Sequence, residues 1–116
     1  MATIGKDIDY ASDLLRSGEL VGIPTETVYG LAANCLNDRA VAHIFAVKDR
    51  PSFDPLIAHT HSFDRLHEFV NHIPDRAHAL ASRFWPGPLT MVLPKKNIIP
   101  DIVTSGLETL AVRVPD

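Results

Sequence analysis

The run Pro24-Thr25-Glu26-Thr27-Val28-Tyr29-Gly30-Leu31 decides how this chain is interpreted. It is followed by Lys48-Asp49-Arg50-Pro51 and then by Pro55-Leu56-Ile57-Ala58-His59. The first run offers a hydroxyl-bearing turn beside backbone N–H groups, and the second offers two cations on a loop stiffened by proline. Both features suit the binding of an anion. Together, in this order, they indicate a nucleotide-binding enzyme.

The composition is that of one ordinary globular domain. The chain has 116 residues, of which 46% are hydrophobic and 22% charged, and its formal net charge is −3. A negative balance argues against a protein that coats nucleic acid non-specifically, although a single cleft can still be basic. Cys35 is the single cysteine, so no intramolecular disulfide can form. No apolar run is long enough to cross a bilayer and no secretory signal opens the chain, which predicts a cytoplasmic protein without a membrane partner.

Hydrophobic periodicity predicts helices that alternate with strands, and hence an α/β or α+β sheet protein. The stretch from Pro24 to Thr27 could also be a turn and helix N-cap, with Thr25 capping a short segment over 26–31. The helix that opens at Pro74 is predicted to bury Ala77, Leu80, Ala81, Phe84 and Trp85. The main helices are expected over 7–17, 39–48, 63–70 and 74–85, and the strands over 20–23, 56–59, 89–93 and 109–114.

The last of these strands is interpreted as a central strand of the sheet. It runs directly into Val114-Pro115-Asp116 without a closing helix. An uncovered sheet edge requires a partner. We therefore expect a single domain over 1–116 that is incomplete at its C-terminus, or one that an oligomer completes.

Lys48 and Arg50 are the first candidates for chemistry. In extended backbone, residues two apart point to the same side, so these two cations are predicted to converge on a polyphosphate. The alternative is a solvated helix end, where cations favour the helix dipole. The flanking prolines favour the site, because they fix a loop that has no evident structural need for rigidity.

Four other side chains are candidates on their own merits. Thr27 could cap a turn or contact an anion, and Tyr29 could be a core aromatic or a pocket wall. His59 is interpreted as a hydrogen-bonding wall; it shares a predicted strand face with His61, but no third ligand completes a metal site, so no protein-held metal is predicted. Arg113 lies in an apolar strand without an acidic partner in that strand, so it either faces solvent or meets an anion.

These residues resemble the YrdC-type family, the L-threonylcarbamoyladenylate synthases. The resemblance covers most of the chain, and the intact Lys-x-Arg-Pro favours the synthase branch over the YciO-like branch. The matching segments are the Pro24 to Leu31 run, Lys48-x-Arg50-Pro51, Pro55-Leu56 to His59, Phe84-Trp85-Pro86-Gly87-Pro88-Leu89-Thr90, and Gly106-Leu107 with the run from Ala111 to Pro115.

The resemblance implies a twisted mixed sheet with flanking helices around a central cavity. It also implies a nucleotidyltransferase that makes threonylcarbamoyl-AMP and pyrophosphate from ATP, L-threonine and bicarbonate, with Mg²⁺ accompanying ATP. The product would serve threonylcarbamoyladenosine synthesis in tRNA, together with a transferase partner. By the same resemblance, Lys48 and Arg50 are catalytic and bind ATP with Pro51 and Leu56, whereas L-threonine is bound by Thr27, Tyr29, His59 and Arg113.

Two departures from the family pattern stand out. Asp54 replaces an asparagine common among relatives, and the family's Ser-x-Asn motif falls beyond position 116. Two alternatives remain open at this point. One is a double-stranded RNA or tRNA-binding module (a putative translation factor), with Lys95 and Lys96 extending a basic rim. The other is a non-catalytic remnant or carbamoyl-transfer relative, related to hydrogenase-maturation proteins.

Overall fold

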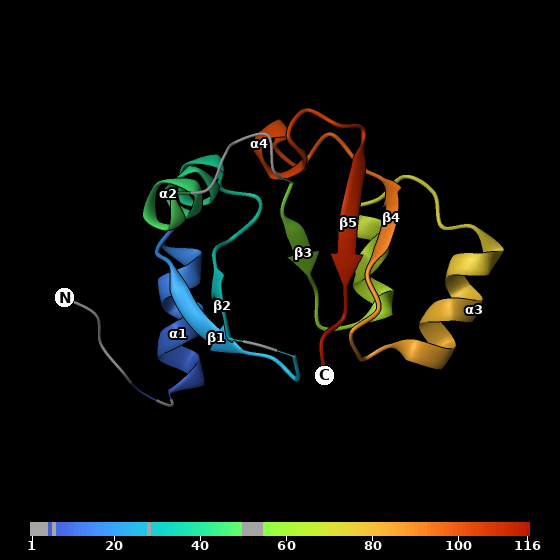
Figure 1. Cartoon of the computed structure of the whole chain (residues 1–116), viewed down its shortest axis with the longest axis horizontal. Coiled ribbons are helices and arrows are strands. Elements are labelled where there is room, and N and C mark those ends of the chain that lie inside the picture. Colours follow the sequence, from blue (N-terminus) through green and yellow to red (C-terminus); the bar gives the residue numbers. More distant parts are fainter. Residues whose placement is uncertain (1–4, 6, 28, 50–54) are drawn as a thin grey trace.

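The computed structural model describes residues 5, 7–27, 29–49 and 55–116, and within them helices and strands alternate as expected. Figure 1 shows α1 and the first two strands on one side of the molecule, and the other three strands with α3 on the other side. No helix in these ranges is long and apolar enough to cross a membrane. The elements are α1 (Ile8–Arg16), β1 (Val21–Pro24), β2 (Tyr29–Ala32), α2 (Asp38–Lys48), β3 (Ile57–His59), a 3-10 helix (Phe63–Glu68), α3 (Asp75–Phe84), β4 (Met91–Pro94), α4 (Asp101–Thr104) and β5 (Thr109–Arg113).

The two longest N-terminal elements begin at side-chain caps. Asp7 accepts a hydrogen bond from the N–H of Tyr10 before α1, and Asn37 accepts one from Ala40 before α2, each satisfying a free N–H of the first turn. Gly18 follows α1 with a φ of 90°, and a Cβ there would lie 2.9 Å from Asn37 Nδ2. Glycine therefore serves both the left-handed backbone and the close approach of the second cap.

The described strands form two sheets. β1 and β2 make an antiparallel hairpin in which Pro24 pairs with Tyr29. The second sheet has the order β3-β5-β4, with β3 parallel and β4 antiparallel to β5. The expected mixed sheet is therefore present, and β5 is its central strand as predicted.

The alternative of a short helix over 26–31 is wrong, because Tyr29–Ala32 form β2. Thr25 Oγ1 does accept a hydrogen bond from the N–H of Thr27 at 3.3 Å, as a cap would. That bond closes a turn, and the chain then pairs back on β1 as β2. A segment this short is a marginal helix, and Tyr29 and Leu31 gain more from strand pairing.

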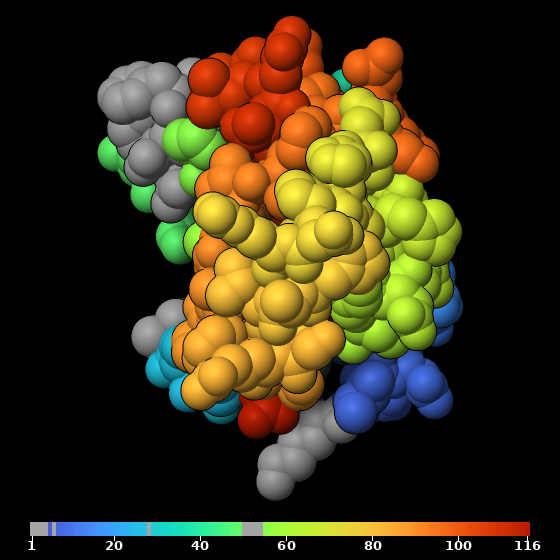
Figure 2. Space-filling view, turned by 90° about the vertical axis from the view of Figure 1, so that its right-hand side faces the viewer, coloured from blue at the N-terminus to red at the C-terminus, as the bar shows by residue number. Residues whose placement is uncertain are grey.

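The apolar stripe of α3 is narrower than the sequence predicts. Ala77 and Ala81 are buried, but Leu80 and Phe84 remain 41% and 47% exposed. The helix therefore approaches the core through its small residues. In Figure 2, α3 and the segment before it form much of the surface on the side that faces the viewer.

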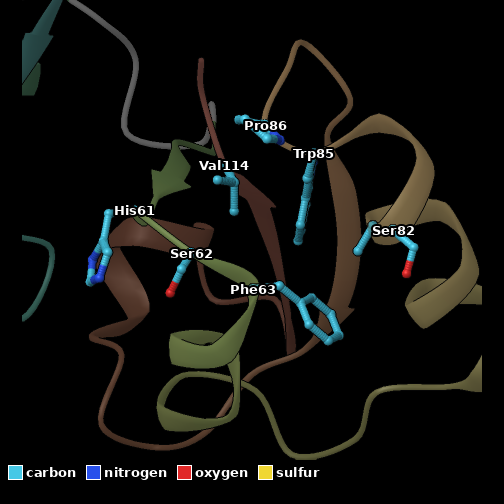
Figure 3. Close-up of a pocket in the computed structure, with 8 residues that line it drawn as sticks. His61, Ser62, Phe63, Ser82, Trp85, Pro86 and Val114 are labelled. Carbon is cyan, nitrogen blue, oxygen red and sulfur yellow. The ribbon is translucent and has the colours of Figure 1, made fainter.

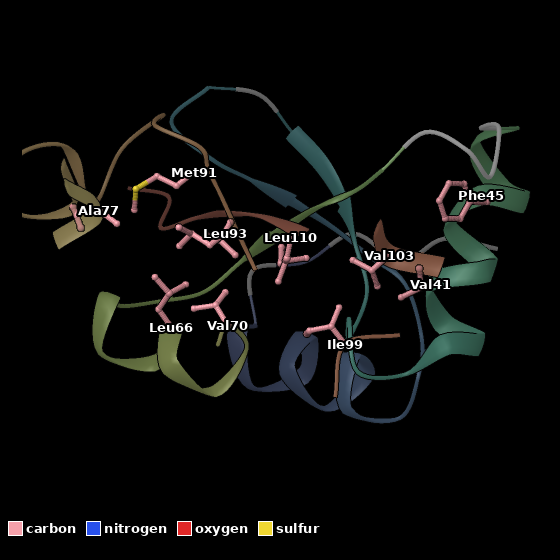
Figure 4. Packing of buried hydrophobic residues seen from close by; sticks show 13 residues of the cluster. Val41, Phe45, Leu66, Val70, Ala77, Met91, Leu93, Ile99, Val103 and Leu110 are labelled. Atoms are coloured by element: carbon pink, nitrogen blue, oxygen red, sulfur yellow. The ribbon is translucent and has the colours of Figure 1, made fainter. Parts of the chain in front are cut away.

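The two faces of β5 have different surroundings because side chains alternate along a strand. Leu110 and Val112, at 0% and 1% exposure, belong to the core cluster together with Leu66 and Leu93 (Figure 4). Arg113 alternates with Val112 and so lies on the opposite face. The register places His59 of β3 beside Arg113. One face of the sheet thus belongs to the core, and the other carries polar candidates.

Replacing Leu110 by alanine tests the central role of β5. We expect Leu110→Ala to lower the free energy of unfolding by about 2–5 kcal/mol, because it removes a fully buried side chain and leaves a cavity. Leu107→Ala is the matched control, since Leu107 is 54% exposed, and we expect a change of about 0.5 kcal/mol or less. Denaturant titration measures both, and equal losses would contradict the assigned core.

Candidate functional site

Arg113 is the centre of the described candidate site. It is 8% exposed, and its guanidinium is held from three directions. Nε donates a hydrogen bond to the carbonyl of Gly87 at 2.8 Å, and Nη1 donates one to Thr27 Oγ1 at 3.2 Å. Nη2 forms an ion pair with the carboxylate of Glu26. The prediction that this arginine meets an anion is confirmed, and the anion is an acidic side chain of the hairpin turn.

The turn between β1 and β2 brings hydroxyl groups to this guanidinium. Thr25 Oγ1 and Thr27 Oγ1 lie 2.9 Å apart and share a hydrogen bond. Because Thr27 accepts a bond from Arg113, its own proton is directed to another acceptor, either Thr25 or a ligand. The tight turn is therefore what presents Thr27 to a residue 86 positions away in the sequence.

Glu26 is a site residue that the sequence reasoning missed. One carboxylate oxygen contacts Arg113, and the other accepts a hydrogen bond from the N–H of Asp116 at 3.2 Å. The contact with the Arg113 guanidinium is the main reason that the pKa of Glu26 is lowered. The available signal was an unpaired arginine in an apolar strand together with an acid in the candidate turn.

Gly87 was also missed as part of the site. Its carbonyl accepts from Arg113, and its N–H donates to the carbonyl of Val114 at 2.8 Å. A Cβ at this position would lie 2.5 Å from the carbonyl oxygen of Phe84, so no side chain fits. The Pro-Gly-Pro turn therefore holds a fixed acceptor against Nε, which sets the plane of the guanidinium.

His59 lies next to Arg113 in the sheet register. Its Nδ1 is 3.2 Å from the carbonyl of Ile57. Burial lowers the pKa of His59, while the contact with Ile57 raises it; Arg113 lowers it and Glu26 raises it more weakly. The net effect favours a neutral ring beside the guanidinium. The structure thus brings together three of the predicted threonine-binding residues, namely Thr27, His59 and Arg113.

Tyr29 and Leu56 occupy different positions from these three. Tyr29 begins β2 and is 82% exposed. Leu56 packs against the core cluster, and its N–H donates to the carbonyl of Val103 at 2.9 Å. Neither residue has a described contact with Arg113.

The expected cation pair is described only in part. Lys48 is the exposed last residue of α2, whereas Arg50 and Pro51 lie outside the described residues. The predicted end of the helix at Lys48 is confirmed, so the assumption of extended backbone, on which the convergence of the two cations was argued, does not hold at Lys48. Asp49 follows in a left-handed conformation with a φ of 52°. The helix therefore ends abruptly after Lys48, and an argument from alternating strand positions does not apply there.

Lys95 does not extend a basic rim. Its side chain is 9% exposed, and its ammonium group contacts Asp101 Oδ1 at 3.1 Å. It also donates a hydrogen bond to the carbonyl of Ile99 at 3.0 Å. The expectation that Lys95 presents a free cation to RNA is therefore wrong, because local contacts already hold its charge.

Two described hollows do not include Arg113 in their lining. One cavity of about 330 Å³ is lined by aromatic rings and hydroxyl groups, together with Val114, which follows β5 (Figure 3). His61 lines this cavity and lies beyond the end of β3, so the shared strand face expected for His59 and His61 is wrong. Another hollow of about 340 Å³ lies between α2 and α4. Within the described ranges, no group of three or more His, Cys, Asp or Glu residues could hold a metal ion.

Comparison with known proteins identifies the family. A family model covering Sua5, YciO and YrdC, described as "Telomere recombination", matches residues 13–116. A threonylcarbamoyl-AMP synthase of Pyrococcus abyssi is 53% identical over 93% of this chain and 32% of its own length. A threonylcarbamoyl-AMP synthase of Bacillus subtilis is 46% identical over 100% of this chain and 34% of its own length.

Solved structures agree with this fold. P. abyssi Sua5 complexed with L-threonine matches with a TM-score of 0.89 and 53% identity, over 91% of this chain and 31% of that one. Escherichia coli YciO, at 21% identity and a TM-score of 0.81, shares the fold. The chain spans about a third of the length of the first two synthases. With most of its residues matched by the family model, the chain belongs to the Sua5, YciO and YrdC family.

Proposed function

We propose that this chain supplies the substrate-binding part of an ATP-dependent threonylcarbamoyl-AMP synthase. The observation that carries the proposal is the buried Arg113, with the Thr27 hydroxyl and the His59 ring beside it. A fixed guanidinium suits the carboxylate of an amino acid, as its contact with the Glu26 carboxylate illustrates. The relative that was solved with L-threonine, at 53% identity, supports this choice of ligand.

In this assignment each group at the threonine end has one task. Arg113 binds the carboxylate, and Thr27 both positions the guanidinium and offers its hydroxyl to the ligand. His59 forms a neutral wall, since burial lowers its pKa. Tyr29, exposed at the start of β2, bounds the ligand from the hairpin side.

At the ATP end we assign the phosphates to Lys48 and Arg50, with Pro51 and Leu56 shaping the surroundings. Mg²⁺ fits here as an ion held through phosphate oxygens and water. The metal would neutralise charge on the triphosphate.

The proposed reaction joins these two ends. The amine of L-threonine combines with bicarbonate to give a carbamate and water. A carbamate oxygen then attacks the α-phosphorus of ATP, the bond from that phosphorus to the bridging oxygen breaks, and pyrophosphate leaves. Such a transfer depends on positioning and charge neutralisation and needs no protein nucleophile. The product would pass to a transferase that modifies tRNA in the cytoplasm.

Arg113→Lys tests the carboxylate site. Lysine keeps the charge but loses the planar fork, so we expect threonine to bind about 10- to 100-fold more weakly. Isothermal titration with L-threonine measures the change. Arg16→Lys is the matched control, because the Arg16 side chain is 78% exposed in α1. Unaltered affinity in a folded Arg113→Lys protein would contradict the assignment.

Lys48→Ala and Arg50→Ala test the phosphate site. We expect each to lower pyrophosphate release by about 100-fold or more, because charge stabilisation of the transferring phosphoryl group is lost. The assay supplies ATP, threonine and bicarbonate to the full-length protein, with omission of each substrate in turn. Arg76→Ala, on the exposed side of α3, controls for the loss of a cation. Turnover of ATP without threonine would count against the synthase.

The lowered pKa of His59 predicts a loss of stability in mild acid. The unfolded chain takes up a proton near pH 6.5, whereas folded His59 does so only at a lower pH. Its contribution is therefore complete above pH 6.5 and is lost as the pH falls toward the folded pKa. Denaturant titrations between pH 7 and 5 should show a shallower pH dependence for His59→Asn than for the wild type. His72→Asn, which alters an exposed histidine, should match the wild type.

A further inference from the structure

Glu26 covers the part of Arg113 that a ligand carboxylate needs. Arg113 is more than nine-tenths buried, and its Nη2 is sealed from solvent without a well-aligned hydrogen-bond acceptor. The Glu26 carboxylate is its ion-pair contact. Nε and Nη1 are already bonded to Gly87 and Thr27. An incoming anion therefore reaches Nη2 only by taking the position of Glu26.

The three partners of Arg113 differ in how easily they can leave. The Gly87 carbonyl is backbone in a turn that tolerates no side chain. Thr27 is tied to Thr25 within the hairpin turn. The side chain of Glu26 is 25% exposed, and its other contacts are with backbone N–H groups, those of Asp116 and of Glu26 itself. Glu26 is therefore the partner that can move into solvent at the smallest cost.

We propose that Glu26 is a specificity-determining residue, a displaceable carboxylate that occupies the place of the substrate carboxylate on Arg113 until the amino acid binds. The inference rests on the proposed function. Glu26 itself demonstrates that the position accepts a carboxylate. A ligand without that group cannot replace Glu26 and gains nothing from Arg113, so the exchange selects for the carboxylate.

The exchange has a measurable consequence for affinity. When a site is open only part of the time, the apparent dissociation constant rises by the inverse of the open fraction. Glutamine at position 26 keeps the size and an acceptor oxygen for the Asp116 N–H, but it loses the charge that holds Arg113. The open fraction then rises, so the glutamine variant should bind threonine more tightly.

Isothermal titration of the full-length protein with L-threonine tests this directly. We expect Glu26→Gln to lower the Kd by about 3- to 10-fold. Glu19→Gln, which makes the same charge change at an exposed position before β1, should leave the Kd unchanged. Thermal melting checks that each variant is folded. Equal or weaker binding by a folded Glu26→Gln protein would overturn the inference.

Hydrogen exchange in the wild type provides a second test that needs no variant. If threonine displaces Glu26, the Asp116 amide loses its acceptor and should exchange faster when the protein is saturated. Unchanged or slower exchange at saturating threonine would overturn the inference while leaving the proposed function intact. Failure of the wild type to bind threonine, alone or with ATP, would overturn both.

Discussion

The contact between Arg113 and the hairpin turn is the constraint on which the candidate site depends. It joins residues separated by 86 positions and connects the two-stranded sheet to the central strand of the three-stranded sheet. Glu26 strengthens the same junction by accepting from Asp116. A buried guanidinium left without these partners would be strongly destabilising. Folding therefore cannot place Arg113 without also placing the turn.

Successive side chains of β5 point to opposite faces of the sheet, so this short strand has two roles. Leu110 and Val112 anchor the core, whereas Arg113 points to the opposite face. Substitutions at Leu110 or Val112 therefore act on stability, and substitutions at Arg113 act on the anion site. The Pro-Gly-Pro turn serves both faces, since Gly87 bonds to Val114 and to Arg113. The guanidinium is therefore held by a turn that is itself hydrogen-bonded to the residue that follows Arg113 in the chain.

Local signals in the sequence were sufficient for most helices and strands, but not for the site. Caps such as Asp7 and Asn37 act within a few residues, so the first two long helices could be predicted. The hairpin depends on pairing between β1 and β2, including Pro24 with Tyr29, whereas local signals left a short capped helix open as an alternative. Glu26 was missed because its partner lies far along the chain. Gly87 was missed because the close approach of the Phe84 carbonyl, which leaves no room for a side chain, depends on the geometry of the turn and cannot be inferred from composition.

The chemistry of a carboxylate exchange explains how a buried arginine can serve as a binding group. A buried guanidinium without any partner would carry a large desolvation cost, so an empty site of this kind would be unstable. With Glu26 in place, the buried guanidinium is paired with a carboxylate whose side chain is 25% exposed. Substitution of a ligand carboxylate keeps that pairing. The free energy of exchange then depends on how strongly each of the two carboxylates interacts with Arg113. Because the Glu26 side chain is partly exposed, water can hydrate its carboxylate when it leaves, which favours the exchange.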